Sequence, residues 1–369
     1  MDKLELVWEK VSVPLTDYPY DILVGPGILT QVPDDLKKDF PASKYILITD
    51  SNVSDVLGQD LLNILVQEGI NVDMLVFPAG EASKIMDTVV DLARRMVAAG
   101  ADRKSIVLAL GGGVTGDIAA FLASIYMRGI PCIQLPTSLL AQVDSSVGGK
   151  TGVDIPEGKN LLGTFSQPLR VYCDIGTLAS LPEGEFRNGL AEVVKYGMIR
   201  SPELFSLLEE HTDALLALEP ELLCKIVAHS CQIKADVVSQ DEKEGGLRRI
   251  LNFGHTIGHA VEAAADYKIP HGEAVSIGMV AVSRIAVYKG IFSEDNVDRL
   301  INLLKRLGLP TAIPAALDTE VLLSLVSHDK KTVSGKTHFV LCSDIGKCLI
   351  TSDVTGDEIK KAIEESRAG

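Results

Sequence analysis

The sequence predicts an α/β protein of two domains, the first built on a doubly wound, mostly parallel sheet and the second α-helical. Apolar runs of strand length alternate with amphipathic helical runs between residues 44 and 138, which is typical of a parallel sheet covered by helices on both faces. From about residue 182 long helical runs replace the strand signal. At 369 residues the chain is also longer than one hydrophobic core normally supports. We therefore expect domains at 1–181 and 182–369, divided in the LASLPEG stretch.

The elements follow in order. The N-terminal segments LELVWEKVSV and YPYDILVG predict an opening hairpin. After it we expect strands at 44–50, 71–80, 104–113 and 131–138, with helices at 54–68, 82–100 and 116–127. Further helices are expected at 185–199, 202–217, 219–240, 248–265, 272–289 and 294–307, and the late segments FVLC and KCLI look extended. The Gly-rich stretch LPTSLLAQVDSSVGGKTGVDIPEGKN is expected to be irregular chain.

Charge and composition exclude several classes of function. A net charge of −15 argues against nucleic acid or an anionic membrane surface as a partner. The six cysteines contain no Cys-x-x-Cys pair, as expected for reduced thiols in a cytoplasmic protein. The N-terminus has no signal-peptide pattern, and no run reaches the roughly 18 apolar residues of a membrane span.

The stretch RRILNFGHTIGHAVEAAADYKIPHGE carries three of the seven histidines of the chain. His255 and His259 are four residues apart and would share one helix face with Glu262, which is the spacing of metal ligands. An ordinary half-buried helix face would have the same spacing. Gly254 and Gly258 each cost a helix about 1 kcal/mol relative to alanine, which is more easily understood if another backbone or a ligand approaches there.

Three other residues strengthen the metal interpretation. His271 follows a proline and opens the next amphipathic run, from which it could return toward the other imidazoles. Glu192 places a carboxylate in the apolar run NGLAEVVKYGMI, with Lys195 three residues later. Two imidazoles and a carboxylate with an open position suit catalytic zinc.

The first domain carries signals for a bound dinucleotide. The LALGGGVTGD stretch places three glycines between a strand and a helix, where backbone N–H groups and the helix dipole can hold a diphosphate. A tight strand-to-helix turn would look the same, and the motif departs from G-x-G-x-x-G. Asp50, at the end of the first parallel strand, could bond a ribose hydroxyl, and Glu81 and Lys84 follow the next strand.

Cations gather in the Gly-rich stretch of this acidic chain. Asp144, Lys150, Lys159 and Asn160 lie there among glycines, although a solvated loop could have the same composition. A small substrate that carries phosphate and carboxylate could be held by these residues together with Lys195, Lys234, Arg248 and Lys330.

The order of these motifs resembles the 3-dehydroquinate synthase family. The motifs are GExxK, GGGVTGD, LPTSLLAQVDSSVGGKTGVD, GKN, GLAEVVKYG, DEKEGGLRRILNFGHTIGHAVE, HGEAVSIGM and DKK, spread over residues 44–341. The resemblance implies a dehydroquinate synthase-like fold with an N-terminal NAD-binding domain, a C-terminal metal-binding domain and an active site between them. It also implies conversion of 3-deoxy-D-arabino-heptulosonate 7-phosphate to 3-dehydroquinate and phosphate, in the shikimate pathway, with NAD and Zn²⁺ or Co²⁺.

The resemblance also implies roles for individual residues. The metal ligands would be Glu192, His255 and His271, leaving His259 to the phosphate. NAD would contact Asp50, Glu81, Lys84, Gly112, Gly113, Asp117, Thr137, Ser138, Lys159, Thr177, Leu178 and Ser180. The substrate would contact Asp144 and Lys195 through its hydroxyls, Lys234 and Arg248 through its carboxylate, and Lys150, Asn160, Asn252, His259 and Lys330 through its phosphate. Glu244 would transfer a proton, and Arg128 would reach the phosphate of a neighbouring subunit in a homodimer.

Two other interpretations are consistent with parts of the pattern. One is another enzyme on the same scaffold, either a different sugar phosphate cyclase or a metal-dependent polyol dehydrogenase that resembles glycerol dehydrogenase. A dehydrogenase would not need Lys150, Asn160, Arg248 and Lys330 together. The other is a non-catalytic regulatory protein that binds NAD or zinc. As an alternative, Arg128 could be a cation at a helix C-terminus.

Overall fold

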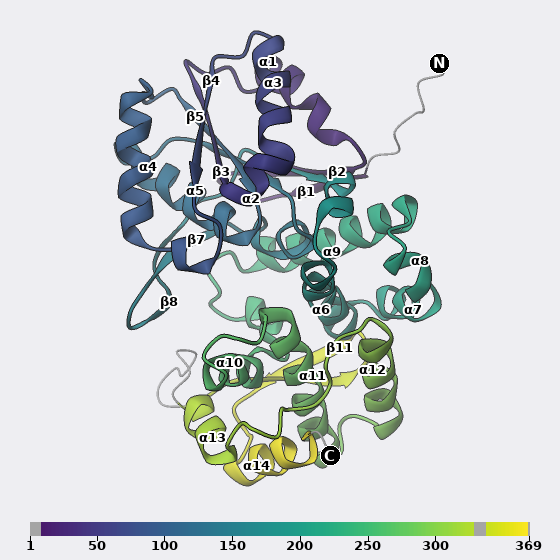
Figure 1. The fold of residues 1–369 in the computed structure, drawn as a ribbon. Coiled ribbons are helices and arrows are strands. Elements are labelled where there is room, and N and C mark those ends of the chain that lie inside the picture. Colours follow the sequence, from purple (N-terminus) through teal and green to yellow (C-terminus); the bar gives the residue numbers. More distant parts are fainter. Residues whose placement is uncertain (1–8, 328–336, 368–369) are drawn as a thin grey trace. The chain divides into compact units, whose positions relative to one another are not determined.

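The computed structural model describes residues 9–327 and 337–367 and divides into two compact units (Figure 1). One unit comprises the chain up to Pro182 and the segment Pro220–Lys243, and the other comprises Glu183–Glu219 and the chain from Glu244 onward. The predicted boundary at 181 lies beside the first junction. Helix α9 (Pro220–Gln240) nevertheless belongs to the first unit, because its apolar side packs against β1 and β2. The two units therefore cannot be separated by one boundary in the sequence, because each is made of two segments.

Over the described residues the first unit holds a seven-stranded sheet, in the order β1-β2-β9-β6-β5-β3-β4. Its strands are β1 (Glu9–Val13), β2 (Tyr20–Gly25), β3 (Tyr45–Asp50), β4 (Val72–Phe77), β5 (Ile106–Gly111), β6 (Cys132–Pro136) and β9 (Arg170–Asp174). β1 and β2 pair antiparallel, as the predicted hairpin requires, and the other pairs are parallel. The chain passes from β4 across β3 to β5, so the strand order reverses between β3 and β5. The predicted doubly wound, mostly parallel sheet is confirmed.

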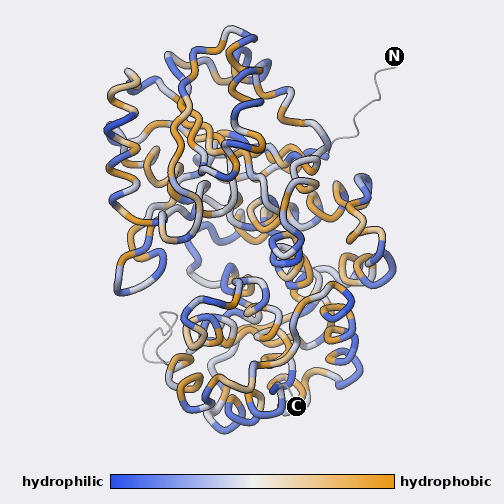
Figure 2. The backbone as a smooth tube through the Cα atoms, in the orientation of Figure 1, coloured by the Kyte–Doolittle hydropathy of each residue, from blue (hydrophilic) through white to orange (hydrophobic). Residues whose placement is uncertain are grey.

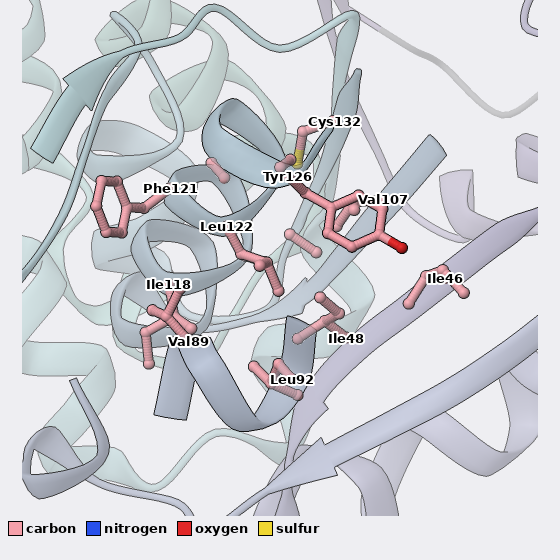
Figure 3. Packing of buried hydrophobic residues seen from close by; sticks show 14 of the residues in the cluster. Ile46, Ile48, Val89, Leu92, Val107, Ile118, Phe121, Leu122, Tyr126 and Cys132 are labelled. Atoms are coloured by element: carbon pink, nitrogen blue, oxygen red, sulfur yellow. The ribbon is translucent and has the colours of Figure 1, made fainter. Parts of the chain in front are cut away.

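Alternating side chains of the central strands enter two separate hydrophobic cores. Ile46 and Ile48 of β3 join one cluster with helices α4 and α5, whereas Leu47 between them joins the other with α1 and α3. Figure 3 shows the first cluster, and Figure 2 shows mainly hydrophobic strands beside helices of mixed hydropathy. The helices are α1 (Val32–Lys38), α2 (Ser51–Val53), α3 (Gln59–Gln67), α4 (Met86–Ala98) and α5 (Gly113–Ile125). Because both faces are covered, the parallel strands are buried and apolar.

The prediction of irregular chain over 135–160 was wrong. A π-helical turn spans Ala141–Ser145, and an antiparallel hairpin follows, formed by β7 (Lys150–Ile155) and β8 (Gly158–Phe165). Gly152 and Gly163 lie opposite each other, and a Cβ on Gly163 would come within 2.2 Å of the Thr151 carbonyl oxygen. These glycines weaken the strand signal in the sequence, although the close backbone approach requires them. Strand β9 was also not predicted.

The second unit is mainly helical, with a small antiparallel hairpin. Its helices are α6 (Glu183–Arg200), α7 (Pro202–Glu210), α8 (Thr212–Leu216), α10 (His255–Ala264), α11 (His271–Tyr288), α12 (Glu294–Arg306), α13 (Thr319–Ser327) and α14 (Gly356–Glu365). The predicted late strands are β10 (Phe339–Asp344) and β11 (Lys347–Thr351), while α13 and α14 were not predicted. Within the described ranges, no helix is long and apolar enough to cross a membrane.

Candidate functional site

In the first unit, the residues predicted to contact NAD gather at one edge of the sheet. Parallel strands β3, β4, β5, β6 and β9 all end at this edge. Each is followed there by some of the predicted residues: Asp50 after β3, Glu81 and Lys84 after β4, Gly112, Gly113 and Asp117 after β5, Thr137 and Ser138 after β6, and Thr177, Leu178 and Ser180 after β9. Open α/β sheets bind ligands at the carboxyl ends of their strands, beside the point where the strand order reverses.

The glycine turn after β5 leads directly into helix α5. Gly112 is the N-cap residue of this 13-residue helix, and among the described residues no side-chain hydrogen bond caps the helix there. A Cβ on Gly111 would lie 2.5 Å from the Thr115 hydroxyl oxygen, and one on Gly113 would lie 3.2 Å from the Ser145 hydroxyl oxygen. The turn therefore has little room for larger residues, and it presents backbone N–H groups and the positive end of the helix dipole to an anion.

The Asp50 carboxylate makes structural hydrogen bonds at this edge. Its Oδ1 accepts hydrogen bonds from the backbone N–H groups of Asn52 and Val53, and its Oδ2 accepts one from the Thr115 hydroxyl at 3.0 Å. The carboxylate thus caps one helix and ties β3 to α5. An aspartate at this position is therefore explained equally well as the N-cap of α2 and as a ligand of a ribose.

Two ion pairs cross the same edge. Lys84 is 6% exposed, and its Nζ lies 2.6 Å from an Asp117 carboxylate oxygen. Burial lowers the pKa of Lys84, but the carboxylates of Asp117, Glu81 and Asp154 together outweigh burial and raise the pKa, which favours the charged lysine. Lys159 on β8 lies 3.6 Å from Glu81. These pairs bring β8 and the segment after β4 to the edge where β5 ends.

The predicted substrate residues of this unit fall into two places. Lys234, on α9, is buried, and its Nζ donates to the Asp144 carboxylate at 2.7 Å and to the Asp144 carbonyl at 2.6 Å. Lys150 and Asn160 are exposed at the hairpin of β7 and β8. Asn160 has a left-handed backbone, with φ of 53°, and its N–H donates to Asp154 at 2.6 Å.

Arg128 lies beyond the end of α5, as predicted, in an unusual backbone turn. Met127, Arg128 and Gly129 all have positive φ, at 50°, 76° and 111°. Two consecutive non-glycine residues in this region cost of order 1–3 kcal/mol each. Arg128 is an exposed residue at the end of the 3-10 turn Tyr126–Arg128.

In the second unit, glycines allow helices α10, α11 and α6 to approach closely. A Cβ on Gly258 would lie 2.9 Å from the Ala274 carbonyl oxygen, and one on Gly278 would lie 2.0 Å from the Gly254 carbonyl oxygen. The backbone approach expected at Gly254 and Gly258 is therefore present. Asn188 of α6 accepts a hydrogen bond from the Gly272 N–H, directly after His271. Asn188 was not predicted, although its spacing of four residues before Glu192 placed it on the same helix face.

These contacts bring Glu192, His255 and His271 together. One potential ligand atom from each lies within 4.8 Å of the others. His255 Nε2 and His271 Nε2 each lie 3.4 Å from Glu192 Oε1. Among the residues that the structure describes, no such group joins His255 to His259, whose ring centroids are 5.3 Å apart. The geometry thus favours the set implied by the family resemblance over the set suggested by helical spacing.

The donor set fits a divalent cation. His255 Nδ1 lies 3.1 Å from the Phe253 carbonyl oxygen, which orients its Nε2 toward Glu192. Burial lowers the pKa of His271, but Glu192 and Glu262 outweigh burial and raise the pKa to about 10. The ion pair of Lys195 with Glu192 is also buried. Two imidazole nitrogens and one carboxylate match the ligand preference of zinc, and the surrounding carboxylates favour positive charge.

The remaining predicted residues of this unit lie on neighbouring segments. Arg248 and Asn252 belong to the 3-10 segment Leu247–Asn252, which leads into α10, and Arg248 is 2% exposed. Asn252 donates to Glu244 at 3.0 Å. His259 is half-buried on α10. Lys330 lies outside the described residues.

Comparison with known proteins agrees with this arrangement. A family model described as 3-dehydroquinate synthase N-terminal matches residues 74–188, and one described as 3-dehydroquinate synthase C-terminal matches residues 189–332. The 3-dehydroquinate synthase of Symbiobacterium thermophilum is 47% identical over 350 residues, covering 94% of this chain and 98% of that protein.

Two solved structures are similar over nearly the whole chain. The first is the 2-epi-5-epi-valiolone synthase of Streptomyces hygroscopicus with bound NAD⁺ and Zn²⁺, with a TM-score of 0.87 and 32% identity, covering 95% of this chain and 98% of that one. The second is a 2-deoxy-scyllo-inosose synthase complexed with carbaglucose-6-phosphate, NAD⁺ and Co²⁺, with a TM-score of 0.89 and 29% identity, covering 97% and 100%.

The fold and its group of three potential metal ligands define an enzyme of the sugar phosphate cyclase class. Within that class the sequence comparison is specific. The chain belongs to the 3-dehydroquinate synthase family.

Proposed function

We propose that this enzyme is a phosphate-eliminating lyase that converts 3-deoxy-D-arabino-heptulosonate 7-phosphate to 3-dehydroquinate and phosphate. The observation that carries the proposal is the group of Glu192, His255 and His271, with Lys195 paired to the same carboxylate. In the overall reaction a ring hydroxyl is oxidised transiently, phosphate is lost, the carbonyl is reduced again, and the opened ring closes by an intramolecular aldol step. The reaction is redox-neutral, so NAD would be a retained cofactor and not a consumed substrate.

Each cofactor has a set of residues proposed to hold it. Glu192, His255 and His271 would bind Zn²⁺ or Co²⁺, and the edge of the sheet at Gly112 and Gly113 would bind NAD. Bound zinc would acidify the C5 hydroxyl of the substrate, and bound NAD would accept its hydride and later return it. The uncapped N-terminus of α5 would hold the NAD diphosphate through backbone N–H groups.

The cationic and proton-transferring residues would act on the substrate. In the first unit, we assign Asp144 to a hydroxyl, Lys234 to the carboxylate, and Lys150 and Asn160 to the phosphate. In the second, we assign Lys195 to a hydroxyl, Arg248 to the carboxylate, Asn252, His259 and Lys330 to the phosphate, and Glu244 to proton transfer. Buried lysine and arginine side chains stabilise developing negative charge by a few kcal/mol each where water is excluded. Lys195, Lys234 and Arg248 are at most 5% exposed, which meets that condition.

We also propose that the enzyme is a homodimer in which Arg128 reaches the phosphate of the partner subunit. Exposed apolar side chains of Ile125, Met127, Leu161, Leu162 and Phe165 support this proposal. A hydrogen bond of 2.7 Å from the Thr164 hydroxyl to the Ser124 hydroxyl holds β8 against α5, so these side chains belong to neighbouring elements. Apolar side chains that gather on a surface are typical of a subunit contact.

A cytoplasmic location completes the proposal. All six cysteines are free thiols, and burial raises the pKa of Cys132 to about 12 and of Cys348 to about 11. Thiols with raised pKa values are mostly protonated and react slowly. Reduced, buried cysteines are what the cytoplasm maintains.

The activity is tested directly by phosphate release. Purified enzyme loaded with NAD and Zn²⁺ is given the heptulosonate phosphate, and phosphate and 3-dehydroquinate are measured together. We expect equal amounts of both products. Phosphate without 3-dehydroquinate, or turnover only of other sugar phosphates, would assign the chain to a different cyclase reaction.

A further inference from the structure

Glu262 is a buried carboxylate that the proposed reaction does not use. It lies on α10, seven residues after His255, and is 6% exposed. A carboxylate in this environment is costly unless polar groups or cations compensate for lost hydration. One such group is the His271 imidazole, because Glu262 Oε2 lies 3.3 Å from His271 Nδ1.

The His271 ring therefore faces a carboxylate with each of its nitrogens. Nε2 lies 3.4 Å from Glu192 Oε1 while Nδ1 faces Glu262. With a cation bound in place of the proton on Nε2, an imidazole that donates its Nδ1–H to an acceptor directs its Nε2 lone pair to that cation on the other side of the ring. His255 has the same arrangement, because its Nδ1 faces the Phe253 carbonyl and its Nε2 faces the same Glu192 oxygen.

We propose that Glu262 is a positioning residue, which holds His271 through Nδ1 so that Nε2 joins Glu192 and His255 around the cation. The inference rests on the proposed metal site and deepens it. His271 is the first residue of α11, directly after the N-cap residue Pro270. Without Glu262 the ring could rotate about its side-chain torsions, and the ligand group would lose its fixed geometry.

A competing role for Glu262 is that of a ligand. Glu262, His259 and His271 also have potential ligand atoms within 4.8 Å of one another. A cation bound by this second group would either compete with the Glu192 site for His271 or bind the other nitrogen of the same imidazole ring. The common orientation of His255 and His271, each with Nε2 at 3.4 Å from one Glu192 oxygen, favours a single cation at Glu192.

The test compares Glu262→Ala and Glu262→Gln with Asp266→Asn. Asp266 lies four residues further along, and its side chain is 84% exposed, so this control removes the same charge without touching the imidazoles. Zinc affinity is measured by competition with a chromophoric chelator, and ligand geometry by the visible absorption of Co²⁺-loaded protein. Thermal unfolding of the metal-free proteins shows whether each variant retains the fold.

We expect Glu262→Ala to bind zinc about 10- to 100-fold more weakly and to shift the Co²⁺ spectrum. Glu262→Gln should lose less zinc affinity than Glu262→Ala, because the amide oxygen still accepts a hydrogen bond from Nδ1–H. Asp266→Asn should bind zinc as tightly as the wild type. Unchanged affinity and spectrum in both Glu262 variants would overturn the inference. The inference would also be overturned if the wild type bound two zinc ions and the Glu262 variants bound one, because Glu262 would then be a ligand. If the wild type binds no zinc, or His255→Ala binds it normally, the proposed metal site itself fails.

Discussion

His255 Nε2 lies 3.4 Å from Glu192 Oε1, so an imidazole of α10 faces a fully buried carboxylate of α6. The two residues are far apart in the sequence and belong to different helices. With His271 on α11 they form a group of three potential metal ligands, and three protein ligands are typical of catalytic zinc sites.

Removal of the metal should abolish activity and leave the fold intact, because the proposed site is catalytic and not structural. Treatment with a chelator should give inactive protein, and Zn²⁺ or Co²⁺ should restore it. His255→Ala should lose stoichiometric zinc, whereas His259→Ala should retain zinc and lose rate. Metal analysis and far-ultraviolet circular dichroism check these outcomes, and full activity in metal-free enzyme would contradict the proposal.

Reduced nicotinamide should not accumulate during steady-state turnover. Each hydride that leaves the substrate returns to the same molecule, so the cofactor ends each cycle oxidised. The near-ultraviolet absorbance of reduced nicotinamide is followed while phosphate is released. Growth of that absorbance in proportion to product would instead indicate a dehydrogenase.

Arg248→Ala should weaken substrate binding by about 1.5–3 kcal/mol, the usual range for a lost hydrogen bond to a charged group. Arg248 is 2% exposed, so its loss also leaves a buried space near the proposed carboxylate position. Michaelis constants and turnover numbers are compared with those of Arg249→Ala, the adjacent and more exposed arginine. If both variants behave like the wild type, Arg248 does not bind the substrate.

Gly258→Ala should destabilise the protein by about 1–3 kcal/mol and weaken metal binding. The new Cβ would meet the Ala274 carbonyl oxygen at 2.9 Å, so α10 and α11 must separate. Gly184→Ala is the matched control, since Gly184 lies on helix α6 and no atom of the described residues lies within 4 Å of the new Cβ. There alanine should change the free energy of unfolding by less than about 1 kcal/mol, toward greater stability. Denaturant unfolding of the two variants measures this difference. Equal stability of Gly258→Ala and Gly184→Ala would show that the contact between α10 and α11 has room for a Cβ.

A hybrid dimer tests whether Arg128 acts on the partner subunit. Arg128→Ala and His255→Ala should each be nearly inactive as homodimers. In a mixed dimer one site carries both defects, while the other has His255 from one chain and Arg128 from its partner. Co-refolding should therefore restore up to about half the activity per hybrid dimer. Hybrids confirmed by mass yet inactive would show that Arg128 acts within its own chain or not at all.

Local patterns in the sequence were sufficient for most of the fold. Strands such as β5 are continuous apolar runs because they are buried on both faces. Helix α4 is amphipathic because only one of its faces meets the sheet. The glycine turn before α5 follows from the same alternation of strand and helix. Where the pattern failed, at the hairpin of β7 and β8, the glycines that permit close pairing also remove the strand signal.

Only the tertiary structure decided which imidazoles gather around one carboxylate. Helical spacing connects His255 with His259, because periodicity describes neighbours on one helix. The contact of α10 with α11 at Gly258 and Gly278 instead brings His271 to His255, and α6 adds Glu192. The return of α9 to the first unit and the contact of Glu262 with His271 have the same origin. Such relationships depend on how helices pack across long sequence separations, which no local pattern records.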